Sequence, residues 1–120
     1  MMAFRCNANF LSSVGVLCLG ISTAQAATIQ LELPGTLDRQ SVSYSCRSGQ
    51  SLSVDYYNLP ESSLAVLSVA GAPRVFVAVL AASGAKYVSG PHVWWTRGNR
   101  GDLIDETKPD ADPDLCKVTR

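Results

Sequence analysis

Two short stretches of the sequence carry the residue types best suited to contacting another molecule. Ser83-Gly84-Ala85-Lys86-Tyr87 combines a hydroxyl, a cation and a phenol, and Trp95-Thr96-Arg97-Gly98 adds a guanidinium beside a second glycine. A serine hydroxyl both donates and accepts hydrogen bonds, and a guanidinium is a permanent cation with five donors. On neighbouring loops of a rigid scaffold, these groups would form one protruding edge that fits into a cleft.

No catalytic set stands beside these stretches. His92 is the only histidine and follows Pro91 at a predicted turn. No sequence pattern identifies the nucleophile and the acid that a histidine-based triad would need. The sequence holds no Walker loop and no G-x-G-x-x-G motif. The carboxylates are numerous, but they cluster in a predicted C-terminal loop region, which disfavours a rigid glycosidase pair. We therefore predict that the protein is not an enzyme and binds no cofactor.

The N-terminal region has the pattern of a secretory signal peptide. Met1–Phe10 carries one charge, Arg5, and Leu11–Ile21 is almost entirely apolar or small. Ala24-Gln25-Ala26 then supplies the small-x-small pattern that precedes cleavage. We predict a signal peptide over residues 1–26 and a single mature domain over residues 27–120.

The residues before Cys18 bear on lipid anchoring. Bacterial lipoproteins place a small residue directly before the lipidated cysteine, whereas Leu17 is bulky. We therefore predict an exported product that carries no lipid and no membrane anchor.

The cysteines indicate one disulfide. Cys6 and Cys18 would leave with the signal peptide, so that Cys46 and Cys116 remain, separated by 116 − 46 = 70 residues. Two cysteines in an exported domain predict a disulfide. With both thiols in that bond, a zinc site of three or four ligands cannot be assembled, and we predict no metal. Closing a loop of this length stabilises a fold by roughly 4 kcal/mol in the chain-entropy model.

The charge balance argues against nucleic acid as a partner. The chain has ten Lys+Arg and ten Asp+Glu, and removal of Arg5 leaves nine against ten, a net charge of −1. Nucleic-acid binders instead show strongly basic patches. Six acids lie in the last fifth of the chain, at Asp102, Asp105, Glu106, Asp110, Asp112 and Asp114. They are interpreted either as a solvated face or as a means of steering a basic partner.

Period-two alternation dominates the mature chain and predicts an all-β fold. Apolar and polar residues alternate over 28–33, 41–46 and 51–56. Further strands are predicted at 64–70, 74–80, 86–89, 93–96, 102–104 and 115–118, with Gly71-Ala72-Pro73 as a hairpin turn. Short strands at regular spacing favour a small antiparallel barrel or sandwich. Trp94 and Trp95 are predicted to be one buried and one outward.

The order of several motifs resembles a known family. The elements Tyr44-Ser45-Cys46, Gly49-Gln50, Ser83-Gly84-Ala85-Lys86-Tyr87, Trp95-Thr96-Arg97-Gly98 and the late Cys116 stand in the sequence in that order. Together they resemble the membrane-bound and periplasmic inhibitors of c-type lysozyme (MliC/PliC). The resemblance covers roughly residues 42–116.

The resemblance implies a fold, a partner and roles for the site residues. It implies a small eight-stranded antiparallel β-barrel and a c-type lysozyme as partner. The loop from Ser83 to Tyr87 would enter the active-site cleft, where Ser83 would hydrogen-bond the catalytic carboxylates and Tyr87 would support the loop. Arg97 stands where many members have Lys and would contact acidic groups, with different geometry because its fork is planar. The bulky Leu17 favours the periplasmic, non-lipidated branch.

Other functions remain possible from the sequence. The first is a periplasmic β-barrel that binds a small ligand or a cell-envelope component in an internal cavity. Tyr44, Tyr56 and Phe76 would argue against such a cavity if they pointed inward. The second is a hydrolase acting on cell-wall sugars. An exposed strand edge would also allow a homodimer.

Overall fold

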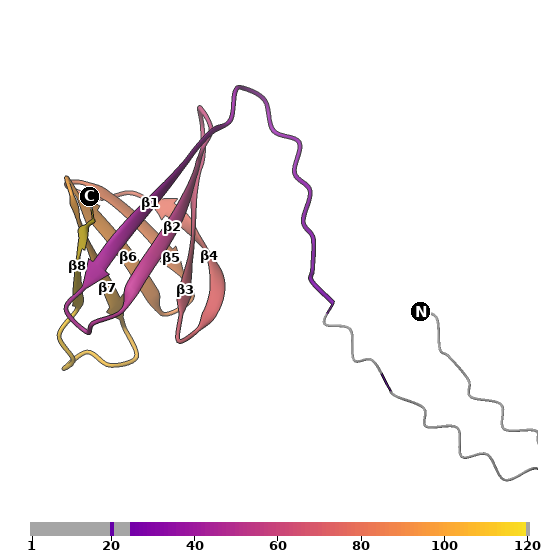
Figure 1. Ribbon diagram of the computed structural model, residues 1–120. Coiled ribbons are helices and arrows are strands. Elements are labelled where there is room, and N and C mark those ends of the chain that lie inside the picture. The colour runs from indigo at the N-terminus through magenta and orange to yellow at the C-terminus, as the bar shows by residue number, and fades with distance from the viewer. Residues whose placement is uncertain (1–19, 21–24, 120) are drawn as a thin grey trace, which may run out of the picture. The chain divides into compact units, whose positions relative to one another are not determined.

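The alternating stretches of the sequence form strands that wind into one closed antiparallel barrel, as Figure 1 shows. The computed structural model describes residues 20 and 25–119. Among these residues, no helix has the length and apolar character needed to span a bilayer. The strands are Asp38–Cys46 (β1), Ser51–Asn58 (β2), Ser63–Val69 (β3), Ala72–Val79 (β4), Ala85–Ser89 (β5), His92–Arg97 (β6), Arg100–Asp105 (β7) and Asp114–Val118 (β8).

Strand pairing and the disulfide close the ring. Each strand pairs with the next one along the chain, and β1 also pairs with β8. That closing seam has only three residue pairs, the last of which is Cys46 opposite Cys116. A disulfide joins these two cysteines, as predicted. The eight-stranded barrel is thus confirmed, and the sandwich is excluded.

Large side chains fill the interior of the barrel. The core consists of buried residues from strands all around the ring: Tyr44, Cys46, Leu52, Val54, Tyr56, Ala65, Leu67, Phe76, Tyr87, Trp94 and Cys116. The inward residues of β2 are Leu52, Val54 and Tyr56, the alternation that the sequence predicts. Because Tyr44, Tyr56 and Phe76 all point inward, the barrel interior does not provide the ligand cavity that the alternative function needs.

Trp94 lies at the centre of this core. It is fully buried, its ring meets that of Tyr44 edge-on at a centroid distance of 5.0 Å, and its Nε1 donates to the Tyr56 hydroxyl at 2.9 Å. The Tyr44 and Tyr56 hydroxyls are themselves 2.8 Å apart and hydrogen-bonded. Gly101 on β7 makes room for the indole, since a Cβ at this position would collide with the Trp94 ring. The polar atoms of three aromatic side chains thus satisfy one another inside the barrel.

Two predictions of local structure were wrong. Residues 28–33 form no strand, and Ile29 and Leu31 are exposed. Alternation produces a strand only where a neighbouring strand is available, and the eight-stranded ring closes without this segment. The hairpin turn lies at Ala70-Gly71, one residue earlier than predicted, because Ala72 and Pro73 already pair with β3.

Of the predicted signal peptide, residues 1–19 and 21–24 lie outside the described residues, so both domain boundaries stay predictions.

Removing the Tyr56 hydroxyl should destabilise the barrel. In Tyr56→Phe the ring remains, but Trp94 Nε1 loses its acceptor inside the core. We expect the free energy of unfolding to fall by about 1–3 kcal/mol, the cost of a buried polar group without a partner. Denaturant unfolding measures this value. The matched control is Tyr57→Phe, which removes the hydroxyl of a half-buried neighbour and should change stability by less than about 0.5 kcal/mol; equal losses would contradict the assignment.

Stability should decline at alkaline pH. Burial raises the pKa of the Tyr56 phenol well above its ordinary value, aided by the hydrogen bond with Tyr44, and burial also raises the pKa of Tyr87. An unfolded tyrosine ionises near pH 10, so the stability contributed by neutral buried phenols is complete below about pH 10 and is lost as the pH rises further. Denaturant unfolding at increasing pH should show this decline, and Tyr56→Phe should make it shallower. A decline as steep in Tyr56→Phe as in the unmodified protein would refute this assignment.

Candidate functional site

The two stretches that the sequence singles out meet at one end of the barrel. Ser83 and Gly84 lie in the loop between β4 and β5, and Arg97 is the last residue of β6. Because β5 and β6 are antiparallel and Ala85 pairs with Thr96, the start of β5 adjoins the end of β6. The structure therefore places Ser83 and Arg97 side by side rather than on opposite faces.

Gly84 permits this close approach. Its φ is +67°, a left-handed conformation that favours glycine, and a Cβ here would clash with the Thr96 carbonyl oxygen and lie 2.9 Å from Arg97 Cγ. Any larger residue would push the loop away from β6. Gly84 thus sets the distance between the Ser83 hydroxyl and the Arg97 guanidinium.

Trp95 connects the two stretches on the outer face. Its Nε1 donates to the Ser83 carbonyl oxygen at 2.9 Å, which holds the loop against β6. The Arg97 guanidinium lies over the indole, with Cζ 4.2 Å from the ring centroid, and Lys86 Nζ lies 5.1 Å from it. Stacking of cations on an aromatic face is worth about 0.5–1 kcal/mol at exposed sites. We call Ser83, Lys86, Trp95 and Arg97 the Trp95 cluster.

The other residues of the predicted loop support it from inside. Tyr87 is buried, and its ring packs against that of Tyr56 at a centroid distance of 5.7 Å. Ala85 is partly buried, and its carbonyl oxygen accepts a hydrogen bond from Thr96 Oγ1 at 3.3 Å. Tyr87 therefore faces the core, while Ser83, Lys86 and Arg97 face outward.

The side chains at this end of the barrel are suited to binding another molecule. His92 begins β6 and so lies at the other end of the barrel from Arg97. In residues 25–119, no Asp, Glu, Lys, Arg or His side chain is buried. Cys46, Asp114 and Cys116 cluster closely enough to hold a metal, but the two sulfur atoms form the disulfide and are not free to coordinate. What the site presents is a hydroxyl and two cations in fixed positions.

The acids from Asp105 to Asp114 lie at the opposite end, and two of them have structural roles. Asp105 ends β7 and accepts hydrogen bonds from the backbone and hydroxyl of Thr107, which hold the pKa of its carboxyl below the usual range. Asp114 begins β8 and accepts from the backbone and hydroxyl of Ser48. These contacts brace the loops that connect the strands there.

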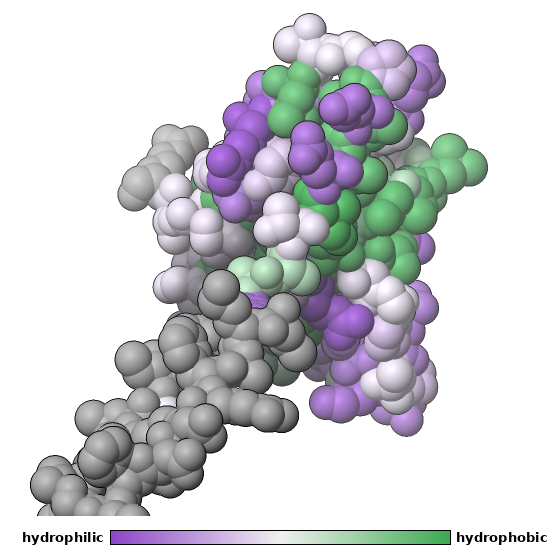
Figure 2. Space-filling model, turned by 90° about the vertical axis from the view of Figure 1, so that its right-hand side faces the viewer, coloured by the Kyte–Doolittle hydropathy of each residue, from purple (hydrophilic) through white to green (hydrophobic). Residues whose placement is uncertain are grey.

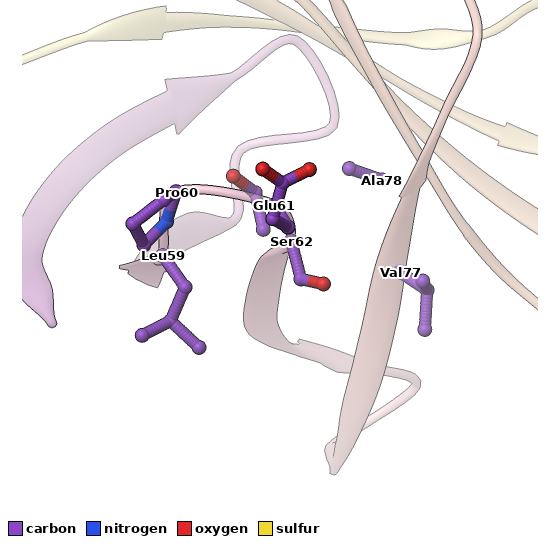
Figure 3. A pocket seen from close by; sticks show the side chains of 7 residues that line it. Leu59, Pro60, Glu61, Ser62, Val77 and Ala78 are labelled. Carbon is purple, nitrogen blue, oxygen red and sulfur yellow. The ribbon is translucent and has the colours of Figure 1, made fainter. Parts of the chain in front are cut away.

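Two further surface features lie on the side of the barrel formed by β3 and β4. Leu59 to Ser63 and the end of β4 enclose a hollow of about 320 Å³, shown in Figure 3, where Glu61 and Ser62 face Val77 and Ala78. The outer side of β4 and the residue directly after it also expose apolar side chains: Val75, Val77, Val79 and Leu80. Figure 2 shows green, apolar surface on this side of the molecule. The homodimer that the sequence allows stays a prediction.

The sequence did not predict that Trp95 binds both the Ser83 loop and the Arg97 side chain. Pairing of Lys86 with Trp95 depends on strand register, which the sequence does not specify. The available signal was the Trp94-Trp95 pair itself, because alternation requires one of two neighbouring residues to face outward. An outward-facing tryptophan two residues before Arg97 is then placed to stack with it.

The Trp95 hydrogen bond should control the mobility of the loop. Trp95→Phe keeps an aromatic face for both cations but removes the donor to Ser83. We expect faster amide hydrogen exchange over residues 82–85, with a loss of about 0.5–1.5 kcal/mol in the free energy of opening, the net value of one hydrogen bond. As a control, Val88→Phe, at an outward position of β5, should leave this exchange unchanged. Unaltered exchange in Trp95→Phe would show that the loop is held by other contacts.

The chain is similar in sequence to proteins of a known family. The family described as membrane-bound lysozyme-inhibitor of c-type lysozyme matches residues 44–112. A protein of Pseudomonas aeruginosa with the name membrane-bound lysozyme inhibitor of C-type lysozyme is 40% identical over 87 residues, which cover 72% of this chain and 68% of that protein. A protein of the same name from Cupriavidus necator is 43% identical over 68 residues, which cover 57% of this chain and 54% of the relative.

A solved structure extends the similarity to the fold. The crystal structure of Pseudomonas aeruginosa MliC in complex with hen egg white lysozyme matches with a TM-score of 0.69 and 35% sequence identity. The match covers 82% of this chain and all of the other chain. The similarity therefore includes nearly the whole barrel.

Proposed function

The chain belongs to the family of membrane-bound lysozyme inhibitors of c-type lysozyme, and we propose that it inhibits a c-type lysozyme by inserting the loop from Ser83 to Tyr87 into the active-site cleft. The observation that carries this proposal is the Trp95 cluster, which holds a hydroxyl and a guanidinium together at one end of a rigid barrel. The named function of the relatives, and the lysozyme bound in the similar structure, support the choice of partner.

The groups of the cluster match the chemistry of such a cleft. A lysozyme uses one carboxylic acid of raised pKa and one nearby carboxylate. The Ser83 hydroxyl can accept from the protonated acid and donate to the carboxylate. The Arg97 guanidinium can add a charge-assisted hydrogen bond, and stacking on Trp95 limits the freedom that it would lose on binding. Inhibition then requires only that the loop occupy the place of the sugar.

The direction in which each loop side chain points suggests its role in the proposed complex. Tyr87 is buried, so we propose that it stabilises the loop through the core and does not touch the partner. Lys86 lies on the outer face with Arg97, and both add positive charge beside the inserted hydroxyl. Gly84 keeps the loop narrow enough to enter a cleft.

We place this activity in the cell envelope. The predicted signal peptide over residues 1–26 and the names of the relatives support an envelope location. Leu17 before Cys18 favours the periplasmic and non-lipidated form, in which the protein would protect bacterial cell walls against host lysozyme.

Substitution of Ser83 or Arg97 should weaken inhibition without unfolding the barrel. Hydrogen bonds to charged groups contribute about 1.5–3 kcal/mol, so Ser83→Ala and Arg97→Ala should each raise the inhibition constant roughly 10- to 100-fold. The measurement is lysis of bacterial cell walls by hen egg white lysozyme in the presence of each variant. The melting temperature should stay within a few degrees because both side chains are outward.

Matched controls come from the opposite end of the barrel. Ser68→Ala, near the end of β3, and Lys108→Ala, in the loop before β8, remove the same kinds of group from exposed positions. Both should inhibit like the unmodified protein. Full inhibition by Ser83→Ala and Arg97→Ala would rule out the insertion mechanism, whereas no inhibition by the unmodified protein would refute the proposed partner.

A further inference from the structure

Three cations stand in one row across the outer face of the barrel. Arg97 on β6 is directly opposite Arg100 on β7, which is directly opposite Lys117 on β8. All three side chains are exposed. Cβ atoms at directly opposite positions are about 4.5–5.5 Å apart, and like charges placed so destabilise a sheet. Such an arrangement costs stability unless an anion binds there.

Little negative charge compensates this row. Arg100 Nε lies 3.4 Å from Asp102 Oδ1, and this is the one salt bridge found for the row within the described residues. The Asp102 side chain is only 13% exposed, so it offers little to solvent beyond that contact. Arg47 lies next to this row, because its backbone N–H donates to the Leu115 carbonyl oxygen and it lines one hollow together with Arg100 and Lys117.

Arg47, Arg100 and Lys117 surround a hollow. It has a volume of about 570 Å³ and is lined by Ser45, Cys46, Arg47, Arg100, Leu115 and Lys117. Ser45 pairs with Lys117 and contributes an exposed hydroxyl to this outer surface. None of the lining residues belongs to the Trp95 cluster, although Arg100 lies opposite Arg97, so the hollow adjoins the proposed lysozyme site without sharing its residues. We call it the cationic groove.

We propose that the cationic groove binds a phosphoryl group. Two guanidinium groups and one ammonium group line the hollow, and the Asp102 carboxylate beside Arg100 compensates one of these three charges. The net charge of 3 − 1 = +2 is neutralised better by a dianion than by a monovalent carboxylate. Guanidinium groups bind phosphate oxygens in a bidentate manner, and the Ser45 hydroxyl supplies a further donor. The ligand is a phosphate monoester, carried either by a lipid headgroup or by a soluble compound.

Titration with inorganic phosphate, followed by NMR of the backbone amides, tests this site. Phosphate should shift the resonances of residues 45–47, 100 and 115–117, whereas acetate at the same ionic strength should not. Lys117→Gln should weaken phosphate binding about three- to fivefold, as expected for one exposed charge pair. This variant keeps the contact between Arg100 and Asp102. The control Lys108→Gln removes the same charge outside the groove and should leave binding unchanged.

Vesicles distinguish the two sources of the phosphoryl group. Binding of the unmodified protein to phosphatidylcholine vesicles that contain phosphatidic acid, lost in Lys117→Gln, would support a lipid headgroup. Phosphate binding without vesicle binding would support a soluble ligand. The proposal is overturned if phosphate shifts none of these resonances, or if Lys108→Gln weakens binding as much as Lys117→Gln. A loss of lysozyme inhibition in Lys117→Gln without an effect on phosphate would also overturn it, because the cations would then belong to the lysozyme contact.

Discussion

The inward packing of Trp94 is the constraint on which both the core and the candidate site depend. Its indole fills the barrel only because Gly101 has no side chain, and its N–H finds the Tyr56 hydroxyl as an acceptor. Successive side chains of a strand point to opposite faces, so burial of Trp94 directs Trp95 outward. Trp95 then binds the Ser83 carbonyl and carries Arg97 on its face. One core residue thus orients the groups that would meet a partner.

A filled barrel explains why recognition must occur on the outside. Tyr44, Tyr56, Phe76 and Trp94 occupy the interior, and the disulfide between Cys46 and Cys116 secures a seam of only three residue pairs. Such a scaffold has little freedom to adapt, and its loops are held in fixed positions. Rigid presentation lowers the entropy that binding would cost, which suits insertion of a short loop into a preformed cleft.

Sequence patterns predicted those parts of the structure that depend on local alternation. Leu52, Val54 and Tyr56 point inward as expected, and the two cysteines of the mature chain form the disulfide. The same rule failed at residues 28–33, because a strand also needs a partner and the ring closes without them. The positions of Trp95 and of the cationic groove depend on which residues face one another across strands. Register is a long-range property, so alternation alone does not reveal that Lys86 lies opposite Trp95 or that Arg100 lies opposite Lys117.

Charge segregation gives the barrel a polarity that its near-neutral composition conceals. Five of the ten Lys and Arg residues lie on or beside the outer face of β5 to β8 and the end of β1: Arg47, Lys86, Arg97, Arg100 and Lys117. The acids from Asp105 to Asp114 gather instead at the end of the barrel away from Arg97. Cations that lie directly opposite one another repel and so lower the free energy of unfolding of the isolated protein. Because the acids from Asp105 to Asp114 lie at the other end of the barrel from these cations, they offset little of this repulsion. A phosphoryl group bound between Arg47, Arg100 and Lys117, as proposed, would recover part of this cost without occupying the loop of Ser83.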